Sequence, residues 1–124
     1  MHLVEKIIML AKKTFEFLSK NKVYWYSWSE TFWTAMEKEI KEAKQVLNNK
    51  VYLEDELWDV LRDYLCLLYA LESEWKITSA EKVFERCWRK FSERVNVEDG
   101  SDNWDWEKIK KIQKERLKKE AENL

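Results

Sequence analysis

Apolar side chains recur every three to four residues along most of the chain, which is the period of an α-helix with one packed face. Near the amino terminus this spacing predicts a first helix over residues 2–20. The positions that carry the pattern there are Leu3, Ile7, Leu10, Ala11, Thr14 and Leu18.

A second and a third helix are predicted in the middle of the chain. Ser27 followed by Glu30 has the capping-box spacing, in which two side chains satisfy backbone N–H groups of the first helical turn. It predicts a second helix that begins there and ends at Asn48–Asn49. A third helix is predicted over residues 52–74, and the short link before it predicts an antiparallel pair.

The fourth helix is predicted from a second capping box. Thr78 is followed by Glu81 at the same spacing, which predicts a helix over residues 79–95. Residues 96–103 are polar and acidic and surround the only glycine, Gly100, so a loop is expected there.

A fifth helix is predicted as a tail over residues 104–122, capped by Asp102 or Asn103. Its lysine-rich part, residues 108–119, carries positive charge, as a segment that binds nucleic acid would. Glutamates interrupt that run, however, and the net charge of the chain is −1. A solvated amphipathic helix is therefore favoured over a nucleic-acid partner.

Composition points to an all-α fold. The 124 residues include no proline and one glycine, which is too little turn chemistry for a chain of short strands. Hydrophobic residues make up 45% and charged residues 38%, which is typical of a globular chain with its own core. We expect one domain over residues 1–124, built as a bundle of about five helices.

No membrane segment or export signal is predicted. The longest uncharged apolar run, Leu65–Leu71, is far shorter than the ~20 residues of a membrane helix. Charged residues break the first fifteen positions, so they do not form a secretory signal. A cytoplasmic protein is expected, with Cys66 and Cys87 as reduced core thiols rather than a disulfide or a zinc site.

Acidic residues border the apolar faces of the second and third helices. At about 100° per residue, Glu39 falls inside the apolar stripe of its helix and Glu42 falls on its edge. Glu56 and Asp59 adjoin the apolar stripe of the next helix in the same way, with Asp63 one turn further on. A carboxylate on a core-facing stripe is costly unless a partner or a metal ion binds it.

Antiparallel packing of these helices would bring the two acidic pairs together. Four carboxylates without basic partners repel one another, and a hard divalent cation with oxygen ligands removes that repulsion. The alternative for each pair alone is a solvated helix face, with nearby lysines as ion-pair partners. Two pairs on facing helices favour the metal site, with Mg²⁺ as the cation and Mn²⁺ as a substitute.

Other common sites are not predicted. The only histidine is His2, so a diiron or zinc enzyme is disfavoured. No phosphate-binding glycine loop, dinucleotide fingerprint or serine-hydrolase elbow occurs in the sequence.

The acidic motifs resemble those of a known family. Residues 38–42 read KEIKE and residues 56–59 read ELWD, similar to the E-E-x-x-E and E-L-G-D elements of MazG-type nucleoside triphosphate pyrophosphohydrolases, in the all-α NTP pyrophosphatase superfamily. RKFSERV (89–95) and WEKIKKIQKER (106–116) resemble its later elements, and WSETFW (28–33) resembles a segment before the first acidic helix. The resemblance spans most of residues 25–116.

The resemblance implies an enzyme. The family converts (d)NTP and water to (d)NMP and pyrophosphate with Mg²⁺, so the expected activity here is nucleotide-pool house-cleaning. The residues carried over as catalytic metal ligands are Glu39, Glu42, Glu56 and Asp59. Family members assemble as homodimers or homotetramers, so we expect oligomerisation to complete a four-helix core.

The resemblance also implies substrate contacts. Lys90 and Arg94 fall where the family has basic residues that reach the triphosphate, which suits phosphate binding. The alternative for both is surface charge. Aromatic side chains of residues 24–28, Trp28 among them, are candidates to stack on the base, and the alternative is packing of this loop onto the second helix.

A second interpretation keeps the fold without the chemistry. Three positions depart from the family pattern, because Lys38, Trp58 and Trp88 replace a glutamate, a glycine and a commonly found asparagine. They favour a catalytically degenerate helical interaction module as the alternative.

Overall fold

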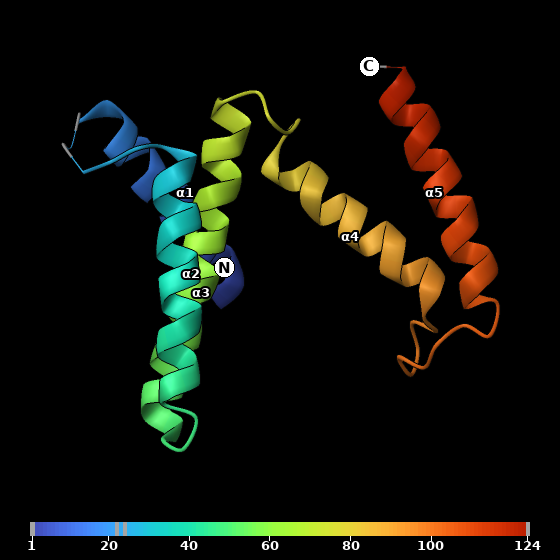
Figure 1. The fold of residues 1–124 in the computed structure, drawn as a ribbon, viewed down its shortest axis with the longest axis horizontal. Coiled ribbons are helices and arrows are strands. Elements are labelled where there is room, and N and C mark those ends of the chain that lie inside the picture. Colours follow the sequence, from blue (N-terminus) through green and yellow to red (C-terminus); the bar gives the residue numbers. More distant parts are fainter. Residues whose placement is uncertain (1, 22, 24, 124) are drawn as a thin grey trace. The chain divides into compact units, whose positions relative to one another are not determined.

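The protein is all-α, as the computed structural model shows for residues 2–21, 23 and 25–123. Five helices follow one another along the chain (Figure 1). They are α1 (Leu3–Lys20), α2 (Ser29–Gln45), α3 (Lys50–Ser73), α4 (Ala80–Arg94) and α5 (Trp106–Glu122). The all-α prediction is confirmed, and the described residues contain no strand beyond one isolated bridge between Val95 and Asp102.

The start of α2 differs from the prediction. The capping box at Ser27 and Glu30 does not form, because the helix begins at Ser29 and the side chain of its N-cap residue, Trp28, makes no capping bond. The cap comes instead from the far end of α3. The Glu74 carboxylate accepts hydrogen bonds from the backbone N–H of Ser29 at 2.9 Å and from its hydroxyl at 2.8 Å. An acid from a distant helix therefore fills the role predicted for a local one.

A second glutamate of α3 acts on α4 in the same way. The Glu72 carboxylate accepts from the backbone N–H of Ala80, the first residue of α4, at 2.9 Å. The start of α3 is capped locally, because the side chain of Asn49 accepts from the N–H of Tyr52 at 3.1 Å. Asn49 was expected to end the second helix, so the structure assigns it to the next one.

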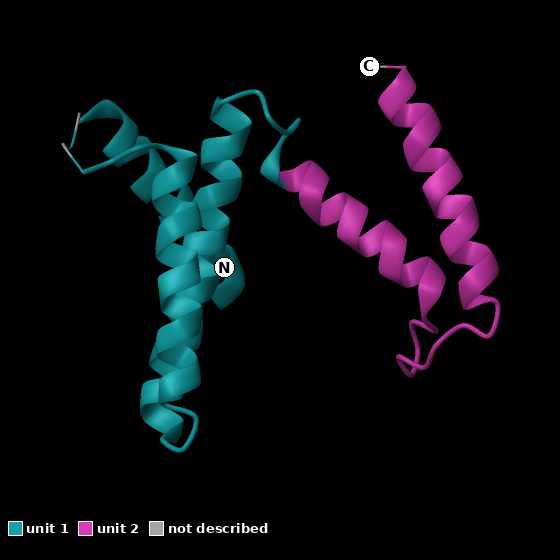
Figure 2. Ribbon diagram, in the orientation of Figure 1, with its two compact units in different colours: residues 1–80 teal, residues 81–124 magenta. Residues whose placement is uncertain are grey.

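The chain divides into two compact units, Met1–Ala80 and Glu81–Leu124 (Figure 2). In the first unit, α3 packs against both α2 and α1, and α2 runs antiparallel to α3 as predicted (Figure 1). The core of this unit lies around one stretch of α3, Leu65–Ala70, in which every residue is buried. Residues from the other segments complete it: Ala11, Leu18, Tyr26, Phe32 and Ala43. The prediction of one domain over residues 1–124 stays a prediction.

The second unit has a different interior. The backbones of α4 and α5 do not approach closely, and long polar side chains bridge them. The only buried residue of α5 is Gln113. Its amide donates to the Lys90 carbonyl and to the Glu93 carboxylate and accepts from the Arg94 guanidinium, at 3.1, 2.9 and 2.7 Å. A hydrogen-bonded glutamine therefore occupies the position that an apolar side chain holds in an ordinary helix pair.

The two cysteines do not share one environment. Cys66 is fully buried, where its thiol contacts the Ala11 carbonyl at 3.6 Å, and burial raises its pKa to about 11. Cys87 is exposed on α4, so the prediction of two core thiols is wrong for this residue. The helical pattern around Cys87 is amphipathic, but in this unit the apolar side of α4 is not covered.

Among the described residues, no helix is long and apolar enough to cross a membrane. This agrees with the expectation drawn from the short apolar runs of the sequence.

Candidate metal centre

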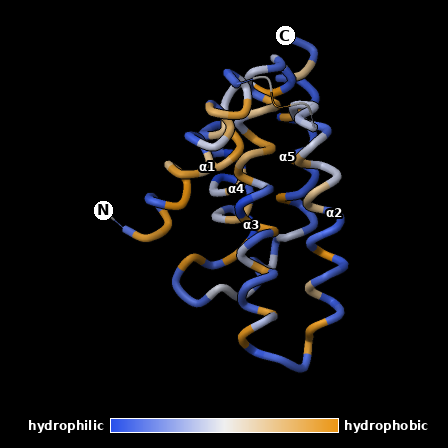
Figure 3. The backbone as a smooth tube through the Cα atoms, turned by 90° about the vertical axis from the view of Figure 1, so that its left-hand side faces the viewer, coloured by the Kyte–Doolittle hydropathy of each residue, from blue (hydrophilic) through white to orange (hydrophobic). Residues whose placement is uncertain are grey.

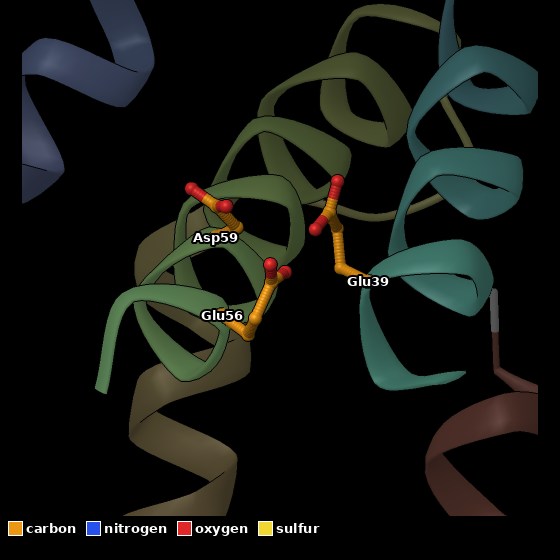
Figure 4. Close-up of side chains that lie close together, drawn as sticks. All are labelled: Glu39, Glu56 and Asp59. Carbon is orange, nitrogen blue, oxygen red and sulfur yellow. The ribbon is translucent and has the colours of Figure 1, made fainter. Parts of the chain in front are cut away.

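Three carboxylates meet between α2 and α3. Glu39 projects from α2, and Glu56 and Asp59 project from neighbouring turns of α3 (Figure 4). Each residue offers an oxygen, and the three oxygens lie within 4.8 Å of one another. The helices place them because a spacing of three residues puts Glu56 and Asp59 on one side of α3. The antiparallel turn at residues 46–49 then sets Glu39 opposite that side.

This acidic cluster is partly withdrawn from water. All three residues are half-buried, and one carboxylate oxygen each of Glu39 and Glu56 is buried without a hydrogen-bond partner. No arginine or lysine forms an ion pair with the three acids within the ranges that the structure describes. Buried acceptors without donors are costly, so this position calls for a proton or a cation.

The protonation behaviour of the cluster follows from this geometry. Burial is the largest cause that raises the pKa of Glu39 to about 7, and the acids beside it, led by Glu56 and Glu42, add to the shift. Burial raises the pKa of Glu56 as well. A like charge nearby disfavours ionisation, so the ionised form of each of these two acids makes ionisation of the other less favourable.

Glu42 and Asp63 lie at the border of the cluster. Glu42 is close enough to affect the pKa of Glu39, but its own carboxylate is 3.8 Å from the Lys38 ammonium, one turn away on α2. The structure thus brings three of the four predicted ligands together and leaves Glu42 beside them with a basic neighbour. Asp63 is half-buried one turn beyond Asp59, and burial raises its pKa.

The donor set fits a hard divalent cation. Ligand oxygens at 2.0–2.1 Å from Mg²⁺ are about 3 Å apart when adjacent and about 4.2 Å apart when opposite, so the three side chains would have to rotate toward one another to bind one ion. With one oxygen from each carboxylate, three of the six coordination positions are left for water or for phosphate oxygens. The absence of histidine and cysteine from the cluster disfavours zinc.

The predicted phosphate-binding residues belong to the second unit. Arg94 donates to Gln113 and stacks over the ring of Trp106 at 5.4 Å, so within that unit it has a structural role. Lys90 lies 6.0 Å from the ring of Phe91, its neighbour on α4. Both contacts lie within the second unit, and a role in phosphate binding stays a prediction.

The predicted base-stacking residue belongs to an aromatic group before α2. The Trp28 ring is tilted against Tyr26 with 4.9 Å between centroids, and Tyr26 in turn packs edge-on against Phe32. Tyr26 and Phe32 are buried, whereas Trp28 is 43% exposed and has a left-handed backbone with φ of 51°. Packing of this loop is therefore confirmed for Tyr26, and stacking of a base on Trp28 stays a prediction. Tyr24 lies outside the described residues.

Two hollows in the second unit are not sites of this kind. One, of about 260 Å³, is lined by charged residues that include the Arg86–Glu120 ion pair. The other, of about 310 Å³, is lined by Glu93, Arg116 and two isoleucines. Arg86 pairs with Glu120 and Arg116 with Glu93 across α4 and α5, so neither hollow holds converging carboxylates without basic partners.

Comparison with protein-family models, with curated proteins and with solved structures finds no match in any of the three. The resemblance to MazG-type enzymes thus rests on the sequence motifs, and the function is argued from the acidic cluster.

Proposed function

We propose that this protein is a Mg²⁺-dependent nucleoside triphosphate pyrophosphohydrolase that converts (d)NTP and water to (d)NMP and pyrophosphate. Glu39, Glu56 and Asp59 are the metal ligands in this proposal. One observation carries it: three carboxylates converge between two helices, two of their oxygens are buried without donors, and no lysine or arginine of the described residues forms an ion pair with them.

Two further features support the assignment. The motifs KEIKE and ELWD place the same residues in the positions of the family's metal ligands. Burial and neighbouring acids also raise the pKa of Glu39 to about 7. Acids with a strongly shifted pKa are frequent at functional sites.

The residues of the chain divide the chemistry among them. When bound, the metal neutralises phosphate charge and acidifies a water for in-line attack. Glu39, Glu56 and Asp59 hold and orient the reacting groups from two helices that pack along their lengths. Asp63, one turn from Asp59 and with a pKa raised by burial, is the candidate residue to accept the proton of the attacking water.

The alternative is a helical interaction module that keeps this fold without turnover. Two observations favour it: the Lys38 ammonium faces Glu42 at 3.8 Å, and Arg94 is engaged by Gln113 and Trp106. In that case the acidic cluster binds a cation for stability and no nucleotide is cleaved.

Hydrolysis of a nucleotide panel separates the two. Purified protein is incubated with ribo- and deoxynucleoside triphosphates and Mg²⁺, and pyrophosphate and monophosphate are quantified. If the protein is an enzyme, the wild type should hydrolyse at least one nucleotide. The rate should fall by at least about 100-fold in Glu56→Gln, because a metal ligand is lost. Glu54→Gln on the exposed side of the same helix is the matched control and should keep full activity.

Cation binding is measured separately, so that the site and the reaction can fail independently. Mg²⁺ and Mn²⁺ should raise the Tm of the wild-type protein and of Glu54→Gln, and should leave the Tm of Glu56→Gln unchanged. Cation binding without turnover on any nucleotide would favour the interaction module. If neither cation binds, both forms of the metal-site proposal are wrong.

A further inference from the structure

One side of α1 is apolar but uncovered within its own unit. Leu3, Leu10 and Phe17 recur seven positions apart along this helix, and they are 72%, 60% and 61% exposed. Seven residues are close to two helical turns, so the three side chains form one row about 21 Å long. Orange and blue stretches alternate along α1 in Figure 3. Large apolar side chains in such a row ordinarily pack against a partner.

A row of lysines runs beside the apolar row. Lys6, Lys13 and Lys20 also recur seven positions apart, and all three are exposed. At about 100° per residue, they lie about 60° around the helix from the apolar row. None of the three has an ion-pair partner in the part of the chain that the structure describes. We call these two rows together the α1 face.

The α1 face is separate from the side of the helix that packs on the core. Ala11 and Leu18 are buried, and the Ala11 carbonyl accepts from the Cys66 thiol of α3 at 3.6 Å. These two buried residues lie about 80–100° around the helix from the apolar row, on the side away from the lysines. α1 can therefore stay packed on α3 while the α1 face contacts a partner.

The charges of α1 are segregated. The two acids of the helix, Glu5 and Glu16, lie about 120–140° around it from the apolar row, beyond the lysines. The α1 face therefore presents apolar and positively charged side chains with no carboxylate among them. Its complement is a surface in which negative charge overlies an apolar layer. An anionic lipid bilayer has this arrangement.

The dimensions of the α1 face suit a helix that lies flat on such a surface. Leu3 is the first residue of α1 and Lys20 is the last, so the face runs the full length of the helix. With roughly 200 Å² for a whole large side chain, the apolar row leaves roughly 400 Å² exposed. An exposed apolar patch of that size is often functional. Lysine side chains are long enough to reach the headgroups while the apolar row lies deeper.

We propose that α1 binds an anionic lipid surface and lies parallel to it, with the apolar row in the boundary between headgroups and acyl chains. The lysine row contacts the negatively charged headgroups. The apolar row adds a contact that salt does not screen, and the lysines give the preference for anionic lipid. The acidic cluster takes no part in this contact, so the proposal is independent of the proposed enzyme activity.

Vesicle co-sedimentation of the full chain tests the proposal. It is performed in EDTA, with vesicles of phosphatidylcholine alone and of equal parts phosphatidylcholine and phosphatidylserine. The wild-type protein should bind the phosphatidylserine vesicles at least about tenfold more tightly, and high salt should weaken this binding. No binding to the phosphatidylserine vesicles, or equal binding to both kinds, overturns the proposal. An acidic protein as the true partner of the α1 face would give the first of these results.

Two neutral substitutions test the two rows separately. Leu10→Gln should weaken binding by about tenfold, because it removes an apolar side chain from the lipid boundary. Lys13→Gln should weaken it by about fivefold, which is the contribution of one basic residue near an anionic surface. Leu117→Gln and Lys114→Gln, at exposed positions of α5, are the matched controls and should bind as the wild type does. If Leu10→Gln also binds as the wild type does, the apolar row does not enter the lipid and the proposal is wrong.

A polarity-sensitive fluorescent label tests the orientation of α1 without relying on affinity. In a Cys87→Ser background the remaining thiol, Cys66, is fully buried, so one introduced cysteine takes the label. The emission of a label on Leu10→Cys should shift to shorter wavelength on phosphatidylserine vesicles, because this position enters an apolar layer. A label on Lys12→Cys, about 160° around the helix from Leu10, should not shift. A shift at Lys12→Cys with none at Leu10→Cys would show that another side of α1 meets the lipid.

Discussion

The carboxylates of the two units behave in opposite ways. In the first unit burial raises the pKa of Glu39 and of Glu56, and neither acid has an ion-pair partner in the part of the chain that the structure describes. In the second unit Arg116 lowers the pKa of Glu93, and Arg86 lowers that of Glu120. The same residue type therefore destabilises one helix pair when it ionises and holds the other pair together.

The contrast extends to apolar residues. The first unit buries a continuous stretch of α3, whereas the second buries one glutamine between its helices and leaves Trp88 66% exposed. The charge pairs Glu93–Arg116 and Glu120–Arg86 in the second unit are structural, since each links α4 to α5. Unpaired charges in the first unit lie beside a core that could have been apolar throughout, which is why they indicate a function.

The largest expected effect is in the core of the first unit. Leu67→Ala removes a fully buried side chain and should lower the free energy of unfolding by about 3 kcal/mol. Urea denaturation at fixed protein concentration, followed by circular dichroism, measures it. Ile112→Ala on α5, where the side chain is 48% exposed, is the control and should change stability by less than about 1 kcal/mol. Equal effects would contradict the difference between the units.

The pH dependence of the metal-free protein tests the cluster. The folded pKa of Glu39 is about 7, above the ordinary glutamate pKa of 4.5, so the folded state binds a proton more tightly than the unfolded state. The contribution of Glu39 to stability should therefore be fully present below about pH 4.5 and should fall as the pH rises through about 7, by about 1–2 kcal/mol after allowance for solvent screening.

The free energy of unfolding is measured by urea denaturation in EDTA between pH 5 and 8, because the pKa shift of Glu39 changes stability over this range. Glu39→Gln should flatten this profile and should be more stable than the wild type at pH 8, because it keeps the shape and removes the charge. A steeper profile in Glu39→Gln would contradict the assignment of the slope to this residue.

The same substitution in the second unit should have the opposite sign. Glu93→Gln removes the carboxylate that accepts from Gln113 and Arg116, so it should lower the free energy of unfolding by about 1 kcal/mol after allowance for solvent screening. Thermal denaturation of Glu93→Gln beside Glu39→Gln at pH 8 gives the comparison directly. Stabilisation by both substitutions would mean that the charges of the second unit are not structural.

The smallest effect is expected for the outer ion pair. Arg86 and Glu120 are linked across α4 and α5, but both side chains are nearly half-exposed. Arg86→Ala should lower the Tm by about 2 °C or less, because water and salt screen such pairs. Repeating the measurement at high salt should shrink the difference further, and a larger loss would show that the pair does more than its exposure suggests.

Much of this arrangement could be predicted from the sequence. The helical period locates all five helices, and the acid spacing on two of them predicts that Glu39, Glu56 and Asp59 meet. These inferences succeed because they depend on a local period and on one short antiparallel connection.

The failures share a physical cause. The predicted start of α2 was wrong because the residue that caps this helix, Glu74, is 45 residues away from Ser29 in the sequence. The exposure of Cys87 was missed because an amphipathic pattern shows which side of a helix is apolar but not whether anything covers it. Pairing between α4 and α5 through Gln113 and Glu93 has no local signal, since each partner looks like an ordinary surface residue in its own helix.

The last turn of α3 has a consequence for how the chain becomes ordered. Glu72 and Glu74 hold the first residues of α4 and α2, so two helix beginnings depend on the completion of a third helix between them in the sequence. On a ribosome, α2 would emerge well before the residue that fixes its first turn. A nascent chain that stops short of Glu74 should therefore show a frayed α2, and the register of the acidic cluster would be set only when α3 is finished.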